Sequence, residues 1–464
     1  MASWAFLELI GAELGDWRLT NRLIRLVEAM AEQPEATVPQ ACGTSGAKAA
    51  YRFFDNPSVD ARKILTPHVA RTALRAAEHQ VVLAPQDTTT LSLTHHPATR
   101  GTGYITSNRK TRGLLMHSTM LLSPQGTPLG VIDQQIWARS LKDYGKAKKA
   151  REKLIQDKES QCWLTSLEAV QQALPKHPQV VVIGDQESDI FDLFAAPRRS
   201  GVDLLVRVCR TGRRVDHEAK YLNQAIAQSP VRGTVTIQLP RGDDRPTRQA
   251  VLSLRWGSFT ILPPRHHPQR RQLSPITLQF ILAEEEHPPA GQEPVRWFLV
   301  TTLPVNSLDD AVRFLRWYSY RWRIERFHFV FKSGCKIEQL QLETAERLQR
   351  AISCYSIVAW RLLWLTYESR ERPDNSCAEI LETHEWQSLH ATVHPDRAIP
   401  KQPPTVREAV RMIAQLGGFL GRKHDGEPGV KTIWRGLRRL SDISRTWELV
   451  QTHHARERCS ATCG

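Results

Sequence analysis

Apolar positions near the N-terminus recur at helical spacing. They fall three or four residues apart, the period of a helix with one buried face, at Leu19, Leu23, Ile24, Leu26, Val27 and Met30. Asp16 precedes them as a candidate N-cap. Basic residues share the segment, at Arg18, Arg22 and Arg25, and Lys48 follows. We therefore expect residues 1–70 to form a helical module that docks on DNA.

From about residue 71 the pattern alternates between strands and helices. Apolar runs predict strands at 81–84, 114–122, 129–137, 180–183 and 204–208. Helical patterns cover 70–79, about 142–173, and 188–194. Three consecutive strands followed by helix, strand, helix and strand is the order of a ribonuclease H-like fold. We expect an α/β core of this kind.

Residues 209 to about 303 interrupt this rhythm. Strand-like segments at 233–239 and 250–262 alternate with turns rich in Pro, Gly and Arg, which predicts a β-rich insertion. Between Arg207 and Arg271 there are 13 Lys or Arg against 4 acids, a surplus of 9. Such a surplus favours contact with a polyphosphate backbone; a solvated loop face is the alternative, above all for 263–268.

The sequence pattern of the C-terminal third predicts helices and no strands. Ser307 is a candidate N-cap for a long helix ending near Lys332, and a second helix covers 344–367. A polar linker rich in Pro and His follows near 371–404, and two more helices lie within 405–450. We expect residues 71–370 to form the catalytic domain, and 371–464 to form a linker and a helical assembly domain.

Composition narrows the class of partner. The 464 residues carry a formal net charge of +15, and 41% of them are hydrophobic. This balance predicts folded domains with a polyanionic partner, foremost nucleic acid. No run of about 18 apolar residues is present, and the N-terminal segment is acidic rather than basic. We therefore expect no membrane association and a cytoplasmic location.

Two other sequence patterns are weak indications of a zinc site and of a phosphate-binding loop. Cys459 and Cys463 follow two histidines and could form a small zinc site, but their loose spacing favours an exposed tail. The segment 43–48 resembles a glycine-rich phosphate loop, but its Lys48 is not followed by Ser or Thr. The eight cysteines are irregularly placed and do not predict a disulfide framework.

Two aspartates stand at equivalent places in the predicted sheet. Asp87 and Asp185 each come at the end of an apolar strand, where open α/β sheets usually carry their site residues. A single aspartate at such a place is ordinarily a cap or turn residue. Two in one sheet indicate a metal site.

The predicted helix ending near 332 adds a polar face. At about 100° per residue, Tyr318, Arg321, Glu325 and Lys332 fall at roughly 0°, 300°, 340° and 320°. Taken alone, this could be a solvated helix surface with an Arg321–Glu325 pair at i,i+4.

The spacing of these four residues, taken with Asp87 and Asp185, closely resembles the bacterial DDE transposase of transposon five, in the insertion sequence four family. Other segments extend the resemblance over nearly the whole chain, at 14–16, 51–53, 87–89, 185–189, 318–328 and 416–419. It implies an N-terminal end-recognition domain, a ribonuclease H-like core with a β insertion, and a C-terminal dimerisation region. Gln186, after the second aspartate, departs from the family pattern.

The resemblance also implies roles for single residues. Asp87, Asp185 and Glu325 would be catalytic ligands of two Mg²⁺ ions, with Mn²⁺ also supporting activity, since carboxylates suit hard cations. DNA would be held by Tyr318, Arg321, Lys332, Arg207 and Arg210, and Trp297 would stack on a flipped base. Trp297 could instead be a core residue, and Arg207 could form a structural ion pair.

The function implied is cut-and-paste DNA transposition. A homodimer in a synaptic complex would bind terminal inverted repeats, cleave at the transposon ends through a DNA hairpin, and join the 3′ ends to target DNA. The setting would be the bacterial cytoplasm, in association with the nucleoid. Two alternatives remain open at this point: a DNA-binding derivative that does not cut, and a nuclease of the same fold that cuts without joining.

Overall fold

The N-terminal region is helical, as the apolar periodicity predicts. The computed structural model describes residues 3–145, 153–239 and 247–462. Its first helices are α1 (Trp4–Leu9), α2 (Trp17–Glu32), α3 (Val38–Asp55) and α4 (Ala61–Ala76). Asp16 caps α2, and Thr37 and Gln40 form a capping box on α3. The segment resembling a phosphate loop lies inside α3, kinked at Gly43, with no strand before it in the described residues.

Five strands form the core of the sheet. They are β1 (Val81–Ser92), β3 (Arg112–Leu122), β4 (Pro128–Trp137), β5 (Gln179–Gly184) and β6 (Val202–Arg207). Their order is β4-β3-β1-β5-β6; β3 runs antiparallel to β1 and β4, whereas β1, β5 and β6 are parallel. The mixed α/β fold and the ribonuclease H-like strand order are confirmed.

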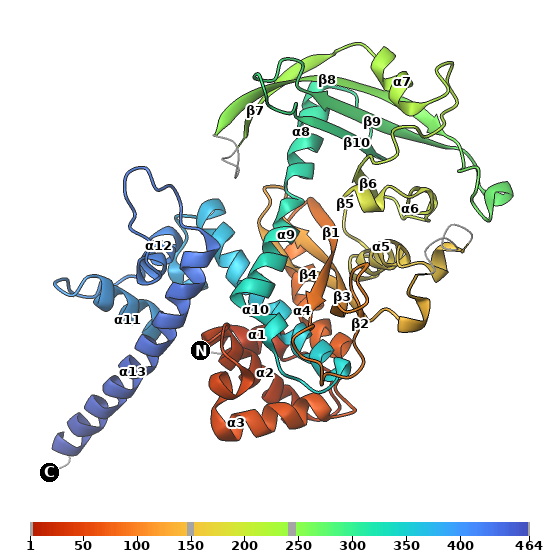
Figure 1. The fold of residues 1–464 in the computed structure, drawn as a ribbon. Helices are drawn as coiled ribbons and strands as arrows, with labels where there is room; N and C mark the ends of the chain where they lie inside the picture. The colour runs from red at the N-terminus through yellow and green to blue at the C-terminus, as the bar shows by residue number, and fades with distance from the viewer. Residues whose placement is uncertain (1–2, 146–152, 240–246, 463–464) are drawn as a thin grey trace.

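The β-rich region continues this same sheet. Its last strand, β10 (Arg296–Thr301), pairs antiparallel with β6. Next to it lie β9 (Ile276–Glu284), β8 (Arg248–Ile261) and β7 (Gly233–Leu239), and the short helix α7 (Leu222–Gln228) precedes them. At the opposite edge β2 (Gly103–Tyr104) pairs with β3. Figure 1 shows the extension as a large twisted sheet above the core.

Alternate residues of the central strands face two different apolar layers. Leu83, Val181 and Ile183 belong to the cluster that includes α10 (Ala345–Glu371). Their neighbours Val82 and Val182 belong to the cluster that includes α5 (Gln161–Ala173) and α6 (Phe191–Ala195). Helices therefore cover both faces of the core. The helix expected from about residue 142 begins only at Gln161, and residues 146–152 lie outside those described.

The long helix expected to end near Lys332 is divided. It consists of α8 (Leu308–Ser319), α9 (Trp322–Phe329) and a π-helical turn over Val330–Gly334. Tyr320 and Arg321 keep right-handed backbone angles at the junction. The prediction of one continuous helix was wrong because the apolar pattern does not distinguish a local change in winding from a straight helix.

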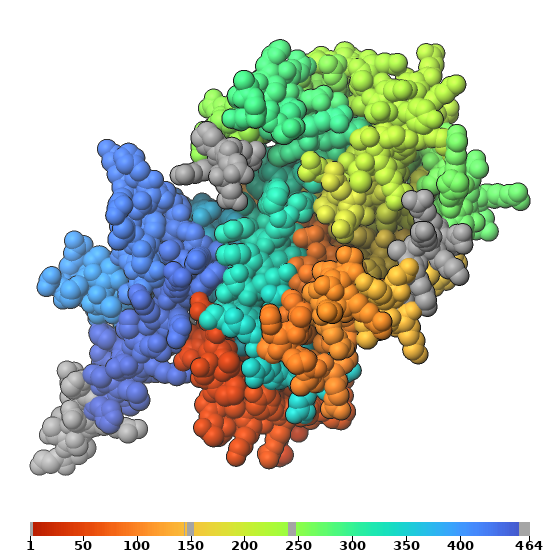
Figure 2. Space-filling view, viewed as in Figure 1, coloured from red at the N-terminus to blue at the C-terminus, as the bar shows by residue number. Residues whose placement is uncertain are grey.

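The C-terminal region contains one helix that the sequence pattern missed. The supposed linker holds α11 (Thr383–Val393), followed as expected by α12 (Val406–Leu416) and α13 (Val430–Thr462). A Cβ on Gly417 would lie 1.8 Å from Thr432 O, and one on Gly436 would lie 1.7 Å from Ile413 O. The backbones of α12 and α13 therefore pack in direct contact. These helices form the blue projection in Figure 2.

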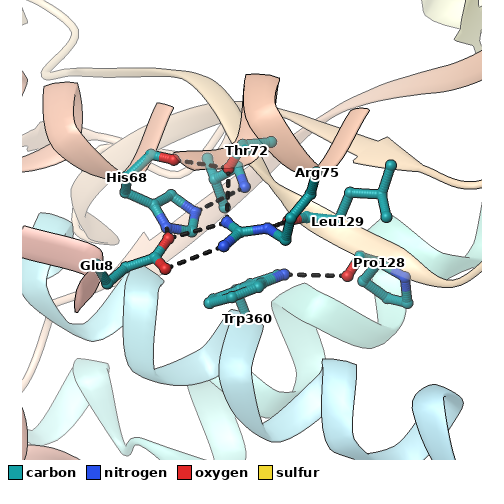
Figure 3. Close-up of polar contacts among 8 residues, drawn as sticks. Glu8, His68, Thr72, Arg75, Pro128, Leu129 and Trp360 are labelled. Atoms are coloured by element: carbon teal, nitrogen blue, oxygen red, sulfur yellow. Dashed lines mark hydrogen bonds and ion pairs between the residues drawn. The ribbon is translucent and has the colours of Figure 1, made fainter. Parts of the chain in front are cut away.

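A buried polar network joins the N-terminal helices to the core (Figure 3). Glu8 Oε1 lies 2.5 Å from His68 Nδ1, and both Glu8 oxygens accept from Arg75, at 2.9 and 3.0 Å. Val131 N–H donates to His68 Nε2 at 2.9 Å, so the imidazole is neutral and carries its proton on Nδ1. The Arg75 guanidinium stacks on Trp360 of α10, 4.4 Å from the ring centroid.

This network shifts the pKa values of its acid and its imidazole. Burial by itself would raise the pKa of Glu8, but the contacts with His68 and Arg75 outweigh it and lower that pKa to about 2. Burial lowers the pKa of His68, in agreement with its acceptor role at Nε2. Glu8 is thus an ionised carboxylate whose charge is fully hydrogen-bonded.

No described helix, the 27-residue α10 included, is apolar enough along its length to cross a membrane.

Candidate active site

Asp87 lies inside β1, not beyond its end. Pairing between β1 and the parallel strand β5 stops at Pro85 and Ile183, whereas pairing between β1 and β3 continues and sets Asp87 opposite Ser118. The expected strand end was wrong because the Thr-rich segment after Asp87 suits an extended strand. Asp87 and Asp185 each lie two residues beyond the last β1–β5 pair, so they flank the same edge of the sheet.

Asp185 follows β5 directly and caps a short 3₁₀ turn over Gln186–Ser188. Its Oδ1 accepts from Glu187 N–H at 2.8 Å. Burial raises the pKa of Asp185, and the charge of Asp87 raises it further. The pKa of Glu187 is raised by burial and by both aspartates. Negative charge is therefore concentrated at this edge.

Glu325 reaches the site from α9, which packs against β1. Its Oε1 accepts a hydrogen bond of 2.6 Å from Arg321 Nη2, and the two side chains are 34% and 8% exposed. Burial alone would lower the pKa of Arg321, but Tyr318, Glu325 and Asp87 raise it above its usual value. Of the predicted polar face, Tyr318 and Arg321 are buried and Glu325 is half-buried, so it is not a fully solvated surface.

Two buried histidines, His328 and His117, lie near Asp87. His328, three residues after Glu325, places its Nδ1 3.5 Å from Asp87 Oδ2. His117 of β3 is opposite Thr88 and contacts its hydroxyl through Nδ1 at 2.8 Å. Burial lowers the pKa of His117 to about 3, so this imidazole is neutral. The sequence reasoning missed both residues; the i,i+3 spacing of Glu325 and His328 was the available signal.

The carboxylates at this site are chemically suited to bind a divalent metal ion. Asp87 and Asp185 provide hard carboxylate oxygens, and their mutual charge raises the pKa of Asp185, which a cation would relieve. Glu325 is engaged with Arg321. Within the residues described, no three His, Cys, Asp or Glu side chains converge closely enough to hold a metal ion. The aspartate pair therefore fits a metal, and Glu325 would have to leave Arg321 to complete the set.

The ring of Tyr318, an expected DNA contact, lies beside both Arg321 and Trp297. Tyr318 is 3% exposed, its hydroxyl has no hydrogen-bond partner among the described residues, and its ring centroid lies 6.2 Å from that of Trp297. Trp297 is half-buried on β10 and packs against the main apolar cluster. Lys332 lies in the π-helical turn, where burial lowers its pKa.

The remaining two arginines approach from β6. Arg207 is half-buried at the end of the strand, and its Nη2 donates to Arg296 O at 3.4 Å. Its charge acts on Tyr318 and helps to lower the pKa of that phenol, which burial raises overall. Arg210 is exposed, and its backbone N–H donates to Asp189 at 2.8 Å. Arg207 thus joins the group around Tyr318.

An open cleft of about 610 Å³ adjoins the acidic edge, and Arg210 lies in its wall. Glu187 also lines it, together with Trp163, Arg139 and Glu159. Arg139 forms a bidentate ion pair with Glu159, at 2.5 and 2.6 Å. The sequence pattern did not single out these residues, because they come from separate loops and helices.

Trp434 of α13 is buried within the chain. It is 3% exposed, its ring centroid lies 5.8 Å from that of Phe329, and its Nε1–H donates to Glu35 at 2.9 Å. The side chains of the Cys459 and Cys463 tail lie outside the described part of the chain.

Models of three known protein families match successive parts of the chain. The family described as Transposase DNA-binding matches residues 1–59, Transposase DDE domain matches 156–360, and Transposase Tn5 dimerisation domain matches 357–451. Among solved structures, the chain is similar to the cryo-EM structure of a piggyBac transposase synaptic complex with hairpin DNA. That likeness has 8% identity and a TM-score of 0.35 over 80% of this chain and 69% of the other.

A DDE domain is the mark of a metal-dependent enzyme that cuts DNA and transfers its strands, and the flanking matches add DNA binding and dimerisation. With the acidic sheet edge and the α9 glutamate in view, the three matches together mark this chain as a Tn5-type DDE transposase of the IS4 family.

Proposed function

We propose that the chain is a cut-and-paste transposase whose catalytic residues are Asp87, Asp185 and Glu325. The observation that carries this proposal is the meeting of three elements: adjacent parallel strands bring the two aspartates to one sheet edge, and α9, which carries Glu325, packs against β1. Site residues at the carboxyl end of parallel strands are the general pattern of open α/β sheets.

The metal is proposed to be Mg²⁺, as two ions, with Mn²⁺ as a substitute. When bound between carboxylates, two such ions activate the attacking hydroxyl and stabilise the leaving oxygen of an in-line displacement. Asp87 and Asp185 would hold them; burial and the charge of Asp87 raise the pKa of Asp185, and a cation would stabilise its ionised form.

Arg321 would control the third carboxylate. Its guanidinium donates to Glu325 Oε1 at 2.6 Å. A DNA phosphate offers Arg321 a bidentate partner of its own. Competition for Arg321 would therefore release Glu325 toward the aspartates only when DNA is in place, so that the site is completed by its substrate.

The side chains around Arg321 would position the DNA. Tyr318 and Lys332 would contact phosphates near the scissile bond, and Arg207 and Arg210 would hold the backbone beyond it. Trp297, half-buried against Tyr318, keeps part of its indole accessible for stacking on a base extruded at the cut end. Such stacking would support a hairpin intermediate.

The other regions would supply recognition and assembly. We propose that residues 1–70 bind the terminal inverted repeats, that 71–370 catalyse with a β insertion at about 209–303, and that 371–464 form the linker and dimer contacts. The matches to DNA-binding and dimerisation families support this division. Two subunits would synapse two ends before joining them to target DNA, in the bacterial cytoplasm at the nucleoid.

The alternative interpretation, a DNA-binding protein that does not cut, is disfavoured by the carboxylates of Asp87, Asp185 and Glu325, because binding alone has no need of three metal ligands. A single experiment distinguishes the candidates: end DNA and a target plasmid are incubated with the chain and Mg²⁺, and products are resolved on denaturing gels. The proposal predicts nicked ends, hairpins and joined products. Binding without cleavage supports the alternative, and cleavage without joining indicates a nuclease.

A further inference from the structure

His328 is buried beside Asp87 and has no other evident task. It is 6% exposed, and its Nδ1 lies 3.5 Å from Asp87 Oδ2. Its Nε2 is buried and has no hydrogen-bond partner among the described residues. A buried polar ring in such a place loses its hydration, and the carboxylate is the acceptor it faces.

Nδ1 is the nitrogen of His328 that faces Asp87. In a neutral imidazole one nitrogen donates and the other accepts. Nδ1 faces Oδ2 of Asp87 at 3.5 Å, which is longer than an ordinary hydrogen bond, and a proton on Nδ1 would be directed at the carboxylate.

The backbone that carries His328 is rigidly held. Ile324 and Phe327 on the same helix are fully buried, and α9 packs against β1. Because His328 lies three residues after Glu325, the two side chains occupy one face of α9. His328 therefore forms a contact between α9, which carries Glu325, and β1, which carries Asp87.

His117 provides a contrast from the same neighbourhood. Its Nδ1 contacts the Thr88 hydroxyl at 2.8 Å, and its Nε2 lies 3.4 Å from Gln86 Oε1. Both of its nitrogens are thus engaged away from Asp87. Of the two buried histidines near the acidic edge, only His328 is within 4.0 Å of the carboxylate in the described structure.

We propose that His328 is a positioning residue that orients Asp87 for metal binding through Nδ1–H. The inference rests on the proposed function, because it takes Asp87 to be a metal ligand. Carboxylate ligands are generally held by such outer contacts, whose loss costs roughly 10- to 100-fold in metal affinity or activity.

The test compares three replacements of His328 in the full chain. In His328→Asn the side-chain amide nitrogen takes the place of Nδ1, in His328→Gln it takes the place of Nε2, and His328→Leu fills space without donating. Mn²⁺ affinity is measured by paramagnetic resonance titration with uncleavable end DNA bound. We expect a loss of about 10-fold or more for Leu and Gln, and near-parental affinity for Asn.

Two controls separate this role from packing and from the proposed function. His177→Leu removes another buried histidine, whose Nε2 contacts Ala76 O at 3.1 Å, and should leave Mn²⁺ affinity unchanged. Equal losses in the Asn, Gln and Leu variants would reduce His328 to a packing residue and overturn the inference. Unchanged affinity in all three would also overturn it. If Asp87→Asn likewise binds Mn²⁺ normally, the assignment of Asp87 as a ligand has failed as well.

Discussion

Arg321 and Glu325 form an ion pair inside the candidate active site, with Nη2 and Oε1 2.6 Å apart. Both residues are expected to act on DNA or metal, yet here they engage each other. A DNA phosphate would compete with Glu325 for Arg321, and a metal ion would compete with Arg321 for Glu325.

Replacing Arg321 with lysine should impair cleavage more than binding. Lysine keeps the charge but lacks the planar fork that could hold a phosphate in two bonds. We expect end cleavage to slow by about 10²-fold or more, with metal-free end binding near the parental value in gel-shift titrations. Arg313→Lys is the matched control, because Arg313 is an exposed α8 residue paired with Asp310. Parental cleavage by Arg321→Lys would contradict the role given to Arg321.

The Glu8 network should contribute strongly to stability. Glu8→Gln removes the carboxylate that accepts from His68 and from both Arg75 nitrogens. We expect the free energy of unfolding to fall by about 3 kcal/mol, as for a broken buried ion pair. Denaturant titration measures it. The control, Glu286→Gln, breaks a more exposed pair with Arg255 at 3.7 Å and should cost less than about 1 kcal/mol. Equal losses in the two variants would mean that the buried Glu8 network stabilises the fold no more than an exposed ion pair does.

The same carboxylate predicts a pH dependence. The pKa of Glu8 is lowered from 4.5 to about 2, so its stabilising effect is complete above pH 4.5 and is lost as the pH falls toward 2. The stability difference between the parent and Glu8→Gln should therefore shrink over this window. Unfolding curves at successive pH values measure the difference. A difference that stays constant down to pH 2 would contradict the lowered pKa.

The contact between α12 and α13 should not tolerate a methyl group. A Cβ on Gly436 would lie 1.7 Å from the carbonyl oxygen of Ile413, so Gly436→Ala must push the two helices apart. We expect the free energy of unfolding to fall by about 1–3 kcal/mol. We also expect weaker dimerisation in sedimentation experiments. Gly429→Ala is the control, since a Cβ there meets no atom within 4 Å. Identical behaviour of the two variants would refute the close packing.

The strands of the core were predictable because their apolar runs are long and their neighbours are turn residues. The strand 180–183 stands out in this way, and it directly precedes Asp185. The position of Asp87 within β1 was less accessible, since whether a strand continues depends on its pairing with β3. The ion pair of Arg321 with Glu325 was foreseen as an alternative from its i,i+4 spacing.

Other features depend on contacts that a one-dimensional pattern does not contain. Helix α11 lies in a polar segment and is stabilised by burial of Trp386 and Leu389 against the C-terminal cluster. The contact of His328 with Asp87 joins residues 241 positions apart. Trp434 donates to Glu35, a contact across 399 positions. In each case tertiary packing decides the outcome.

The most direct measurement is single-turnover cleavage of DNA carrying the element's own flanking ends, in Mg²⁺, by the parent and by Asp87→Asn, Asp185→Asn and Glu325→Gln. Each variant keeps the size of the side chain and removes a carboxylate charge. If the three residues form one metal-dependent site, every variant binds the ends without metal as the parent does, but fails to cut or join them. Cleavage at the parental rate by any one of the variants would contradict the proposed catalytic set.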